Sequence, residues 1–314
     1  MCTSITINTN NNDVILGRTF DWSVSEKYKV IVAPRNYEWT AKSSSEHFDS
    51  KFAFIGLAVE FPIIEHPIFV DGVNEKGLMC ATLWLNDSSY SPYEEGKINL
   101  ESYDIVLWIL SQFSSVDDVL RNISSLNILD SMYTELSFPI TLHWIINDKS
   151  GKSVIIEKTK LGLQIYTDSI GTLTNDPLYY KHLNNLEPYL PFDITIFNSK
   201  RFPGDFSPSS RFIRAALLRQ SIKNASNESE GILNVYKILQ NVSEKDETAL
   251  FLPDSKIYFY TLYTTAMCAN SGNYYATTYR NNQINKFNLF HEDLTSSKLI
   301  KFELSEEQAY NKRN

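Results

Sequence analysis

The sequence predicts an α+β fold with mostly antiparallel sheets and helices on their outer faces. Blocks of strand-forming residues are separated by helical blocks, and no stretch of the 314 residues has the composition of an interdomain linker. Hydrophobic residues make up 43% of the chain and charged residues 21%, which are ordinary values for a globular protein. We therefore expect residues 1–314 to form a single large domain.

The chain begins with a predicted β-hairpin. Residues 3–9 alternate polar and apolar side chains, residues 10–13 break the pattern, and an apolar run resumes over residues 14–20. Alternation interrupted by turn-forming residues is typical of two paired strands. Cys2 then lies on the leading edge of the first strand. Further strands are expected at residues 27–34, 51–59 and 78–84.

Helices are predicted next. Residues 103–113 repeat apolar side chains at three- and four-residue spacing, and residues 114–126 begin with Ser and Asp capping residues before a second amphipathic stretch. Two more helices are expected at residues 209–222 and 231–242. The remaining strands are expected at residues 140–148, 153–159, 163–168, 256–269, 274–279 and 284–290.

Residues 183–210 contain several prolines and show no regular apolar period. This composition predicts a long surface loop. Loops of that length often carry function.

The charge balance bears on the partner and the compartment. The 29 basic and 37 acidic residues give a net charge of -8, which argues against a nucleic-acid partner and favours a small molecule. The N-terminus lacks the basic and apolar regions of a signal peptide, and no apolar run reaches the roughly 18 residues that cross a bilayer. Three widely spaced cysteines suit a reducing compartment. We expect a cytoplasmic protein that does not bind membranes.

Cys2 is the main catalytic candidate. Removal of the initiator methionine would leave a thiol and a free α-amino group on this one residue. An α-amino group has an ordinary pKa of about 7.7 to 8.0, so near neutral pH it can take the thiol proton. Nucleophile and base would then belong to the same residue, as in N-terminal nucleophile enzymes. A cysteine at this position can also be incidental.

Arg18 and Asp21 interrupt the second strand of the same hairpin, where folding back brings them near Cys2. A carboxylate could orient the α-ammonium group, and a guanidinium could favour the thiolate. The alternative is an ion pair exposed at the end of the strand.

Other kinds of site are less well supported. The five histidines are scattered, and neither a metal-binding pattern nor a nucleotide-binding loop is present, so we expect no metal and no organic cofactor. His143 lies in an apolar strand and is predicted to be a core residue. Cys80 and Cys268 are flanked by apolar strand residues and are predicted to be structural.

Seven stretches resemble motifs of the choloylglycine hydrolase and penicillin V acylase family, a group of N-terminal nucleophile amidases. They are MCTS (1–4), GRTFDW (17–22), DGVNEKGLMCATLW (71–84), TLHWIIND (141–148), TNDP (174–177), PGDFSPSSRFIRAALLR (203–219) and TLYTTAMC (261–268). The resemblance runs in register from Met1 to about residue 295. It implies a four-layer αββα sandwich and hydrolysis of linear, non-peptide amides without a cofactor.

The resemblance also implies roles for particular residues. It assigns the nucleophile to Cys2, the cation beside the thiol to Arg18, and the group that holds the α-amino nitrogen to Asp21. It implies that Asn175, in the T-N-x-P motif, donates to the oxyanion of the tetrahedral intermediate. It makes Arg211, in the S-R-F motif, an active-site cation.

The sequence departs from the family pattern at two places. Where bile salt hydrolases usually carry Asn and penicillin V acylases of similar length carry Tyr, this chain has Trp84, whose indole N–H can donate a hydrogen bond but cannot accept one. With Trp22, it forms a candidate aromatic wall for an apolar acyl group. Relatives also have a longer Gly-rich stretch before residues 203–206, which reaches into a neighbouring subunit of a tetramer. A homo-oligomer is expected, but the shortened stretch puts the tetramer in doubt.

These observations favour a cysteine amidase of the penicillin V acylase type. The alternatives within the family are a conjugated bile salt hydrolase, which releases glycine or taurine, and an N-acyl homoserine lactone acylase. A catalytically silent binding protein is the alternative outside enzymology, and retention of Met1 would favour it.

Overall fold

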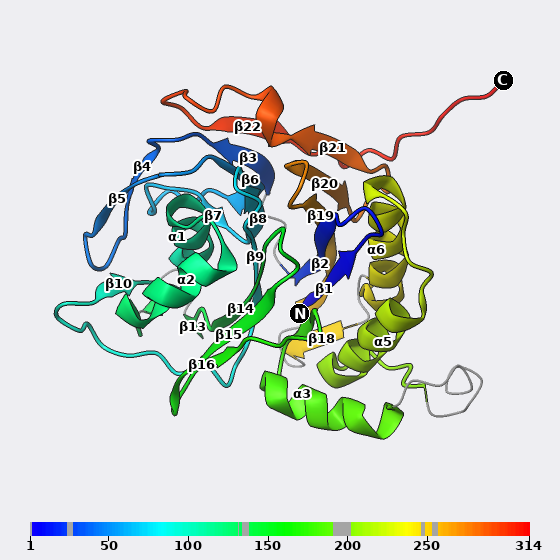
Figure 1. The fold of residues 1–314 in the computed structure, drawn as a ribbon, viewed down its shortest axis with the longest axis horizontal. Helices are drawn as coiled ribbons and strands as arrows, with labels where there is room; N and C mark the ends of the chain where they lie inside the picture. Colours follow the sequence, from blue (N-terminus) through cyan, green and yellow to red (C-terminus); the bar gives the residue numbers. More distant parts are fainter. Residues whose placement is uncertain are drawn as a thin grey trace.

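Two antiparallel β-sheets lie face to face, and helices cover their outer sides (Figure 1). A computed structural model describes residues 2–23, 28–130, 132–133, 138–190, 202–245, 249–252 and 257–314. The first sheet runs in the order β17 (Thr172–Thr174), β1 (Cys2–Asn8), β2 (Val14–Trp22), β19 (Ile257–Cys268), β20 (Asn273–Thr278) and β21 (Asn285–Asn288), with β18 (Ala249–Leu252) paired to β19.

The second sheet faces the first. It runs in the order β16 (Gly162–Tyr166), β15 (Ser153–Thr159), β14 (Leu142–Asn147), β9 (Met79–Trp84), β8 (Asp71–Asn74), β6 (Phe54–Val59), β3 (Lys29–Ala33) and β22 (Ile300–Glu303), with β7 (Ile68–Phe69) paired to β6. Smaller pairs are formed by β4 (Glu38–Thr40) with β5 (His47–Asp49), β10 (Ile98–Leu100) with β11 (Leu126–Ile128), and β12 (Met132–Tyr133) with β13 (Phe138–Pro139).

Helices form the two outer layers. On the second sheet lie α1 (Ile105–Gln112) and α2 (Val116–Asn122), and on the first lie α3 (Tyr179–Leu186), α5 (Pro208–Ser221) and α6 (Glu228–Val242). Short 3-10 turns are η1 (Ser102–Asp104), η2 (Ile123–Ser125), η3 (Glu187–Tyr189) and η5 (Leu289–His291). The four layers confirm the predicted αββα sandwich.

Helix α5 begins where the sequence chemistry favours a start. The hydroxyl of Ser207 accepts from the N–H of Ser210, and Pro208 occupies the first turn, where its missing N–H costs nothing. Helix α6 begins the same way, with the Asn227 side chain accepting from the N–H of Glu230. These caps fix the ends of the two helices that pack on β1 and β2.

The alternation of side chains along the β1–β2 hairpin divides them between two cores. Ile5 and Ile15 point to the helix side, where they pack with α5 and α6. Cys2, Leu16 and Phe20 point to the other face and pack between the two sheets. Successive residues of a strand face opposite sides, so this division follows directly from the register.

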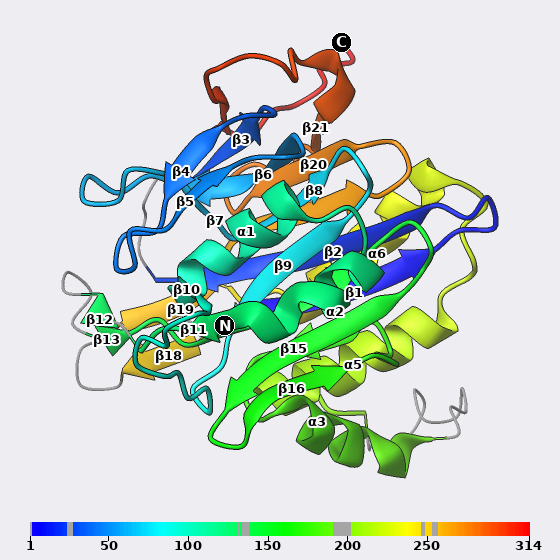
Figure 2. The same cartoon turned by 60° about the vertical axis from the view of Figure 1, so that its left-hand side comes forward.

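The C-terminal part of the chain joins the two sheets at one edge. Strand β21 ends the first sheet and β22 ends the second, so residues 285–303 pass from one sheet to the other (Figure 2). None of the helices in the described part of the chain is long and apolar enough to span a membrane.

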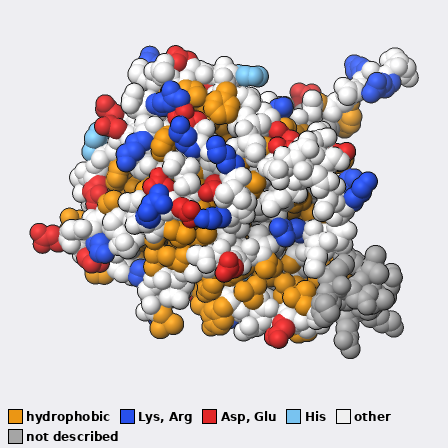
Figure 3. Space-filling model, viewed as in Figure 1, with side chains coloured by type: hydrophobic (Ala, Val, Ile, Leu, Met, Phe, Trp, Pro, Cys, Tyr) orange, Lys and Arg blue, Asp and Glu red, His pale blue; other side chains and the backbone are white. Residues whose placement is uncertain are grey.

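The surface seen in Figure 3 is uneven in composition. Lys, Arg, Asp and Glu side chains are interspersed over α1 and α2, whereas hydrophobic side chains gather over β14 to β16 and α3. Leu161 at the β15–β16 turn, Ile165 on β16 and Tyr180 on α3 are among the exposed large apolar side chains of the chain.

The predicted loop at residues 183–210 is wrong at both of its ends. Helix α3 continues to Leu186, η3 covers residues 187–189, and α5 begins at Pro208, while residues 191–201 lie outside the described part of the chain. Tyr179, His182 and Leu186 form the buried side of α3 at helical spacing. Asn184, Asn185 and Pro188 interrupt this spacing in the sequence and favour a loop there.

Gly56 on β6 lies where this strand closely approaches the neighbouring strand β8. A Cβ atom at this position would lie 2.0 Å from the carbonyl oxygen of Asp71, a backbone atom that cannot move aside. We expect Gly56→Ala to lower the free energy of unfolding by about 3 kcal/mol, measured by urea denaturation. Gly204→Ala is the control, because its Cβ meets nothing within 4 Å. An equal effect of both substitutions would contradict the close approach.

Candidate active site

The register of the first hairpin brings Cys2 and Arg18 together. Cys2 pairs with Phe20, so Arg18, two residues earlier on β2, lies on the same face of the sheet. Arg18 Nη2 donates to Cys2 Sγ over 3.0 Å. The thiol is buried, and the guanidinium is completely buried. The prediction that Arg18 lies near Cys2 is confirmed, and the exposed strand-end ion pair is excluded.

Arg18 is held rigidly by both sheets. Its Nη2 also donates to the carbonyl of Thr82 on β9, and its Nε donates to the carbonyl of Thr19, each over 3.0 Å. Its Nη1 lies 3.6 Å from Oδ2 of Asp71 on β8. Burial lowers the Arg18 pKa, but the charges of Cys2 and Asp71 outweigh burial and the net shift is upward. The guanidinium is therefore a permanent positive charge beside the sulfur.

Asp71 is the fixed counter-charge of Arg18. It accepts hydrogen bonds from the Tyr274 hydroxyl over 2.5 Å and from the Thr265 hydroxyl over 2.8 Å. Burial raises the pKa of this carboxyl, and Arg18 and the two hydroxyls oppose the rise. Because Asp71 belongs to the second sheet and Arg18 to the first, the pair fixes the two sheets in register across the interface.

Asp21 points to the opposite side of β2 from Arg18, because the two positions differ by three and successive side chains of a strand alternate between its faces. Its Oδ1 accepts from the Thr261 hydroxyl over 2.6 Å, and its Oδ2 lies 3.9 Å from Nη1 of Arg211. The side chain is almost fully buried. Asp21 therefore faces α5 and the main chain of Cys2, and Arg18 faces the thiol.

Arg211 on α5 occupies the centre of this second cluster. Its Nη1 donates to the carbonyl of Cys2 and to the hydroxyl of Thr3, each over 2.7 Å. Its Nη2 donates to Oδ1 of Asn175 over 3.0 Å, and its Nε lies 3.2 Å from Oε1 of Glu244. The guanidinium is completely buried. Arg211 thus holds the main chain of Cys2 from the α5 side of the first sheet.

Asn175 connects Arg211, Cys2 and the second sheet. Its Oδ1 accepts from the main-chain nitrogen of Cys2 over 2.5 Å, and its Nδ2 donates to the carbonyl of Trp84 over 2.9 Å. Because the guanidinium of Arg211 has only donors, the atom that faces it must be the oxygen. This settles the orientation of the amide and leaves one Nδ2 hydrogen for another acceptor.

His182 on α3 binds the main chain of Asn175. Its Nε2 lies 2.8 Å from the carbonyl oxygen of Asn175, so this nitrogen carries the proton. The ring stacks on Phe212, with centroids 4.6 Å apart and planes 13° apart. Burial lowers the His182 pKa to about 4, which keeps the imidazole neutral at physiological pH. No pattern in the sequence marks this histidine as part of the site.

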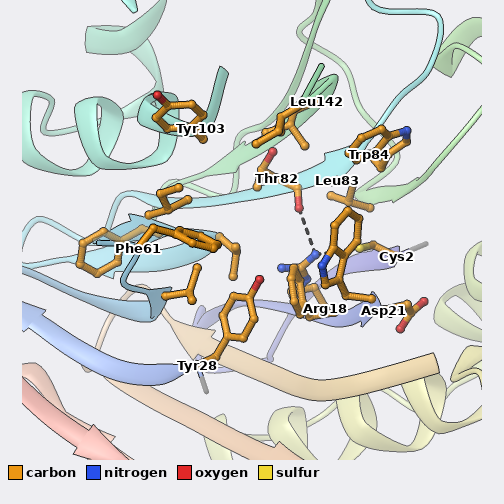
Figure 4. A pocket seen from close by; sticks show the side chains of 17 residues that line it. Cys2, Arg18, Asp21, Tyr28, Phe61, Thr82, Leu83, Trp84, Tyr103 and Leu142 are labelled. Atoms are coloured by element: carbon orange, nitrogen blue, oxygen red, sulfur yellow. Dashed lines mark hydrogen bonds between the residues drawn. The ribbon is translucent and has the colours of Figure 1, made fainter. Parts of the chain in front are cut away.

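A pocket of about 850 Å³, including space open to solvent at its mouth, begins at Cys2 and runs between the sheets. In Figure 4, Cys2, Arg18 and Trp84 lie at one end, and Phe61 and Tyr103 lie toward the other. Among the described residues that line it, only Arg18 and Asp21 are charged. The remaining lining is mainly aromatic and aliphatic, which suits an apolar ligand.

Trp22 and Trp84 lie together beside Cys2, as the sequence predicts for an aromatic wall. Their rings are 5.7 Å apart, and Trp22 also stacks on Phe259 at 5.3 Å and 15°. The Trp84 indole N–H donates to Oδ1 of Asn86 over 2.8 Å, and Asn86 Nδ2 donates to Asp176 over 2.9 Å. This side chain therefore orients the loop next to Asn175 as well as forming the pocket wall.

Cys80, Cys268 and His143 lie in buried strands, as the sequence predicts. Cys80 and Cys268 are buried free thiols, and burial raises the pKa of both. His143 is buried with its Nδ1 3.1 Å from Oε1 of Glu157. Within the described ranges, no group of three or more His, Cys, Asp or Glu side chains is arranged to hold a metal ion.

Comparison with known proteins places this arrangement in a family. The family model described as "Linear amide C-N hydrolases, choloylglycine hydrolase family" matches residues 2–302. The chain belongs to the choloylglycine hydrolase family. It is therefore a linear amide C–N hydrolase, as the sequence predicts.

Individual members of the choloylglycine hydrolase family differ in their similarity to this chain. A bile salt hydrolase/transferase from Clostridium perfringens is 34% identical over the full length of both chains. A crystal structure of a mutant conjugated bile acid hydrolase from the same organism matches with a TM-score of 0.89 and 33% identity over all of both chains. A penicillin V acylase from Pectobacterium atrosepticum is 26% identical over 74% of this chain and 59% of its own.

Arg18→Gln tests the guanidinium beside the thiol. Loss of a charge-assisted hydrogen bond worth about 1.5 to 3 kcal/mol should slow alkylation of Cys2 by iodoacetamide at pH 7 by about tenfold or more. Peptide mass spectrometry separates Cys2 from the other two thiols. Arg214→Gln, at a buried arginine outside the pocket that donates to the Pro203 carbonyl, is the control and should react like the parent protein.

Arg18→Gln also leaves Asp71 as a buried charge without its partner, which can unfold the protein. The double variant Arg18→Gln/Asp71→Asn removes both charges and separates the two effects. Alkylation at the parent rate in the folded double variant would exclude a role of Arg18 in activating the thiol.

His182 gives a pH-dependent prediction. Its native pKa of about 4 lies below the ordinary value of 6.5, so the unfolded state binds more protons as the pH falls. The stability that depends on neutral His182 is present above pH 6.5 and is lost as the pH falls toward 4. Between pH 7.5 and 4.5 this loss amounts to about 2.5 kcal/mol. His182→Gln should show a correspondingly smaller loss in urea unfolding, and equal losses would contradict the prediction.

Proposed function

We propose that Cys2 is the nucleophile of this amidase and that its substrates carry an apolar, ring-containing acyl group. One observation carries the proposal: the sulfur of Cys2, 3.0 Å from Arg18, lies at one end of an apolar pocket next to the Trp22–Trp84 pair. The thiolate end can attack a carbonyl carbon, and the apolar part can hold the acyl group that this carbonyl terminates.

Removal of Met1 frees the α-amino group of Cys2, which then acts as the base. In the attack step this amine takes the thiol proton, a C–S bond forms and the carbonyl oxygen gains negative charge. Asn175 Nδ2, which has one hydrogen left after binding the Trp84 carbonyl, donates to this oxyanion. The side chain can serve this role because Arg211 and Cys2 fix its other end.

The tetrahedral intermediate then collapses. The C–N bond breaks, and the α-ammonium group gives its proton to the leaving amine. Water then attacks the thioester, passing a proton to the α-amine, and the acid is released as the thiol re-forms. Asp21 and Arg211 act behind Cys2, where Asp21 holds the α-ammonium and Arg211 holds the main-chain carbonyl.

The pocket favours an aryloxyacetyl group such as that of phenoxymethylpenicillin. Two adjacent indoles offer flat apolar faces close to the thiol, and aromatic rings gain about 0.5 to 1.5 kcal/mol from such contacts beyond their burial. Conjugated bile salts are the second candidate, because the 34% identical relative is a bile salt hydrolase/transferase and the penicillin V acylase is less similar. Both acyl groups are apolar and contain rings.

The sequence predictions on assembly and location remain proposals. A homo-oligomer is consistent with the exposed apolar side chains over β16 and α3. The shortened stretch of the 190s lies outside the described residues. A cytoplasmic location is proposed from the three free thiols, which suit a reducing compartment.

Parallel turnover of phenoxymethylpenicillin and glycocholate tests the acyl preference. With Met1 removal confirmed by intact mass, we expect the larger kcat/KM for phenoxymethylpenicillin, and no turnover by Cys2→Ala. Trp84→Leu should lower kcat/KM for this substrate about tenfold, because the aromatic contact and part of the buried area are lost.

The other outcomes are decisive as well. A preference for glycocholate overturns the aryloxyacetyl assignment in favour of bile salts. Turnover of neither substrate by the Met-free protein favours a different acyl amide or a binding role. A native protein that keeps Met1 excludes the α-amino mechanism.

A further inference from the structure

Glu244 is a second carboxylate beside Arg211, and the proposed mechanism does not use it. It lies just after α6, its side chain is completely buried, and its Oε1 is 3.2 Å from Arg211 Nε. No described residue donates a hydrogen bond to either of its carboxylate oxygens. A buried charge is costly unless it is compensated, so the guanidinium of Arg211 is what stabilises the ionised form.

The backbone fixes Glu244 relative to Asp21. The Glu244 N–H donates to the Thr261 hydroxyl over 2.9 Å, and this hydroxyl donates to Asp21 over 2.6 Å. The Thr261 N–H in turn donates to the Glu244 carbonyl over 3.0 Å. Thr261 therefore binds both the Asp21 carboxylate and the main chain of Glu244. These bonds keep the two carboxylates next to Arg211.

The charges of this cluster do not cancel by themselves. Arg211 carries one positive charge, and Asp21 and Glu244 together carry two negative charges when ionised. The α-ammonium of Cys2 brings the sum to zero. The other titratable described residues, which line a polar groove together with Glu244, are Tyr236 and Lys237 on α6, Lys245, and Tyr279 after β20. Both lysines are exposed, so solvent screens their charge.

Arg211 creates the need for the second carboxylate. It contacts the Cys2 carbonyl and, through Asn175, the Cys2 nitrogen, so its positive charge opposes protonation of the α-amino group. We propose that Glu244 is a positioning residue whose carboxylate offsets the charge of Arg211, so that the α-amino group can hold the proton that the leaving amine takes. The inference rests on the proposed role of the α-amino group.

The titration of Glu244 agrees with this role. Burial, together with the neighbouring Asp21 charge, raises the Glu244 pKa to about 7, and Arg211 opposes the rise. The negative charge of Glu244 is therefore present above neutral pH and is lost as the pH falls below it. Glu244 is therefore negatively charged in the pH range above 7, where the α-ammonium group would otherwise lose its proton.

Competitive acetylation of the α-amino group tests the inference without any substrate. Acetic anhydride reacts with the unprotonated amine, so the extent of labelling against pH gives the α-amino pKa. The Met-free Cys2→Ala protein keeps the amine and removes the competing thiol. Adding Glu244→Gln should lower the labelling midpoint by about one pH unit. Glu244→Asp in place of Glu244→Gln keeps the charge and should return the midpoint most of the way to the value of the Cys2→Ala protein.

Asp104→Asn is the matched control. Burial raises the pKa of this carboxyl to about 7 as well, but its partner is His66 at 3.2 Å, and it belongs neither to the pocket nor to the Arg211 cluster. It should leave the midpoint unchanged. An unchanged midpoint in Glu244→Gln overturns the inference, and a lower melting temperature with an unchanged midpoint assigns Glu244 a purely structural role.

The pH profile of kcat/KM separates this inference from the proposed function. If a substrate is turned over, the alkaline limb in Glu244→Gln should move to lower pH by the same amount as the labelling midpoint. A shifted midpoint without turnover of any substrate would contradict the proposed function alone. Turnover with an unshifted midpoint would contradict the inference alone.

Discussion

The pleat of the β1–β2 hairpin is the constraint on which the rest of the site depends. It sends the Cys2 thiol and Arg18 into the space between the sheets, and it sends Asp21 toward α5. The site is therefore divided into a side that contains the sulfur and the apolar pocket and a side that contacts the main chain of Cys2. A register shift of one residue would exchange the two sides and destroy both.

Each side contains a buried guanidinium whose charge is compensated by one or two carboxylates. Arg18 is compensated by Asp71 and acts on the thiol, and Arg211 is compensated by Asp21 and Glu244 and acts on the Cys2 backbone. Buried ion pairs contribute little net stability, but removing one partner is costly. Their value here is positional, because each guanidinium connects a strand of the first sheet to a different layer of the fold.

Local pattern predicted the part of the site that lies within one hairpin. The alternation of residues 3–9 and 14–20 was sufficient to bring Arg18 to Cys2, and motif resemblance supplied Asn175 and Arg211. The same pattern predicts that Asp21 lies near Cys2 along the hairpin, but closeness along the hairpin does not show that Asp21 faces the helix layer.

Glu244 and His182 could not be found from local pattern. Each reaches the site only because helices pack on the first sheet, and both stand in polar stretches that look solvated in the sequence. Asp71 is the first residue of the DGVNEKG motif, so the sequence could have marked it as a candidate. Its burial against Arg18, however, depends on how the two sheets stack. Contacts between layers are therefore what the sequence alone does not supply.

Trp84 is attached to the Asn175 loop through both its side chain and its main chain. Its indole holds Asn86 and, through it, Asp176, and its carbonyl binds Asn175. Replacing the Trp84 side chain removes the bond to Asn86 and, with it, one support of the loop that carries Asn175. A change of this one side chain therefore affects the wall of the pocket and the support of the Asn175 loop at the same time.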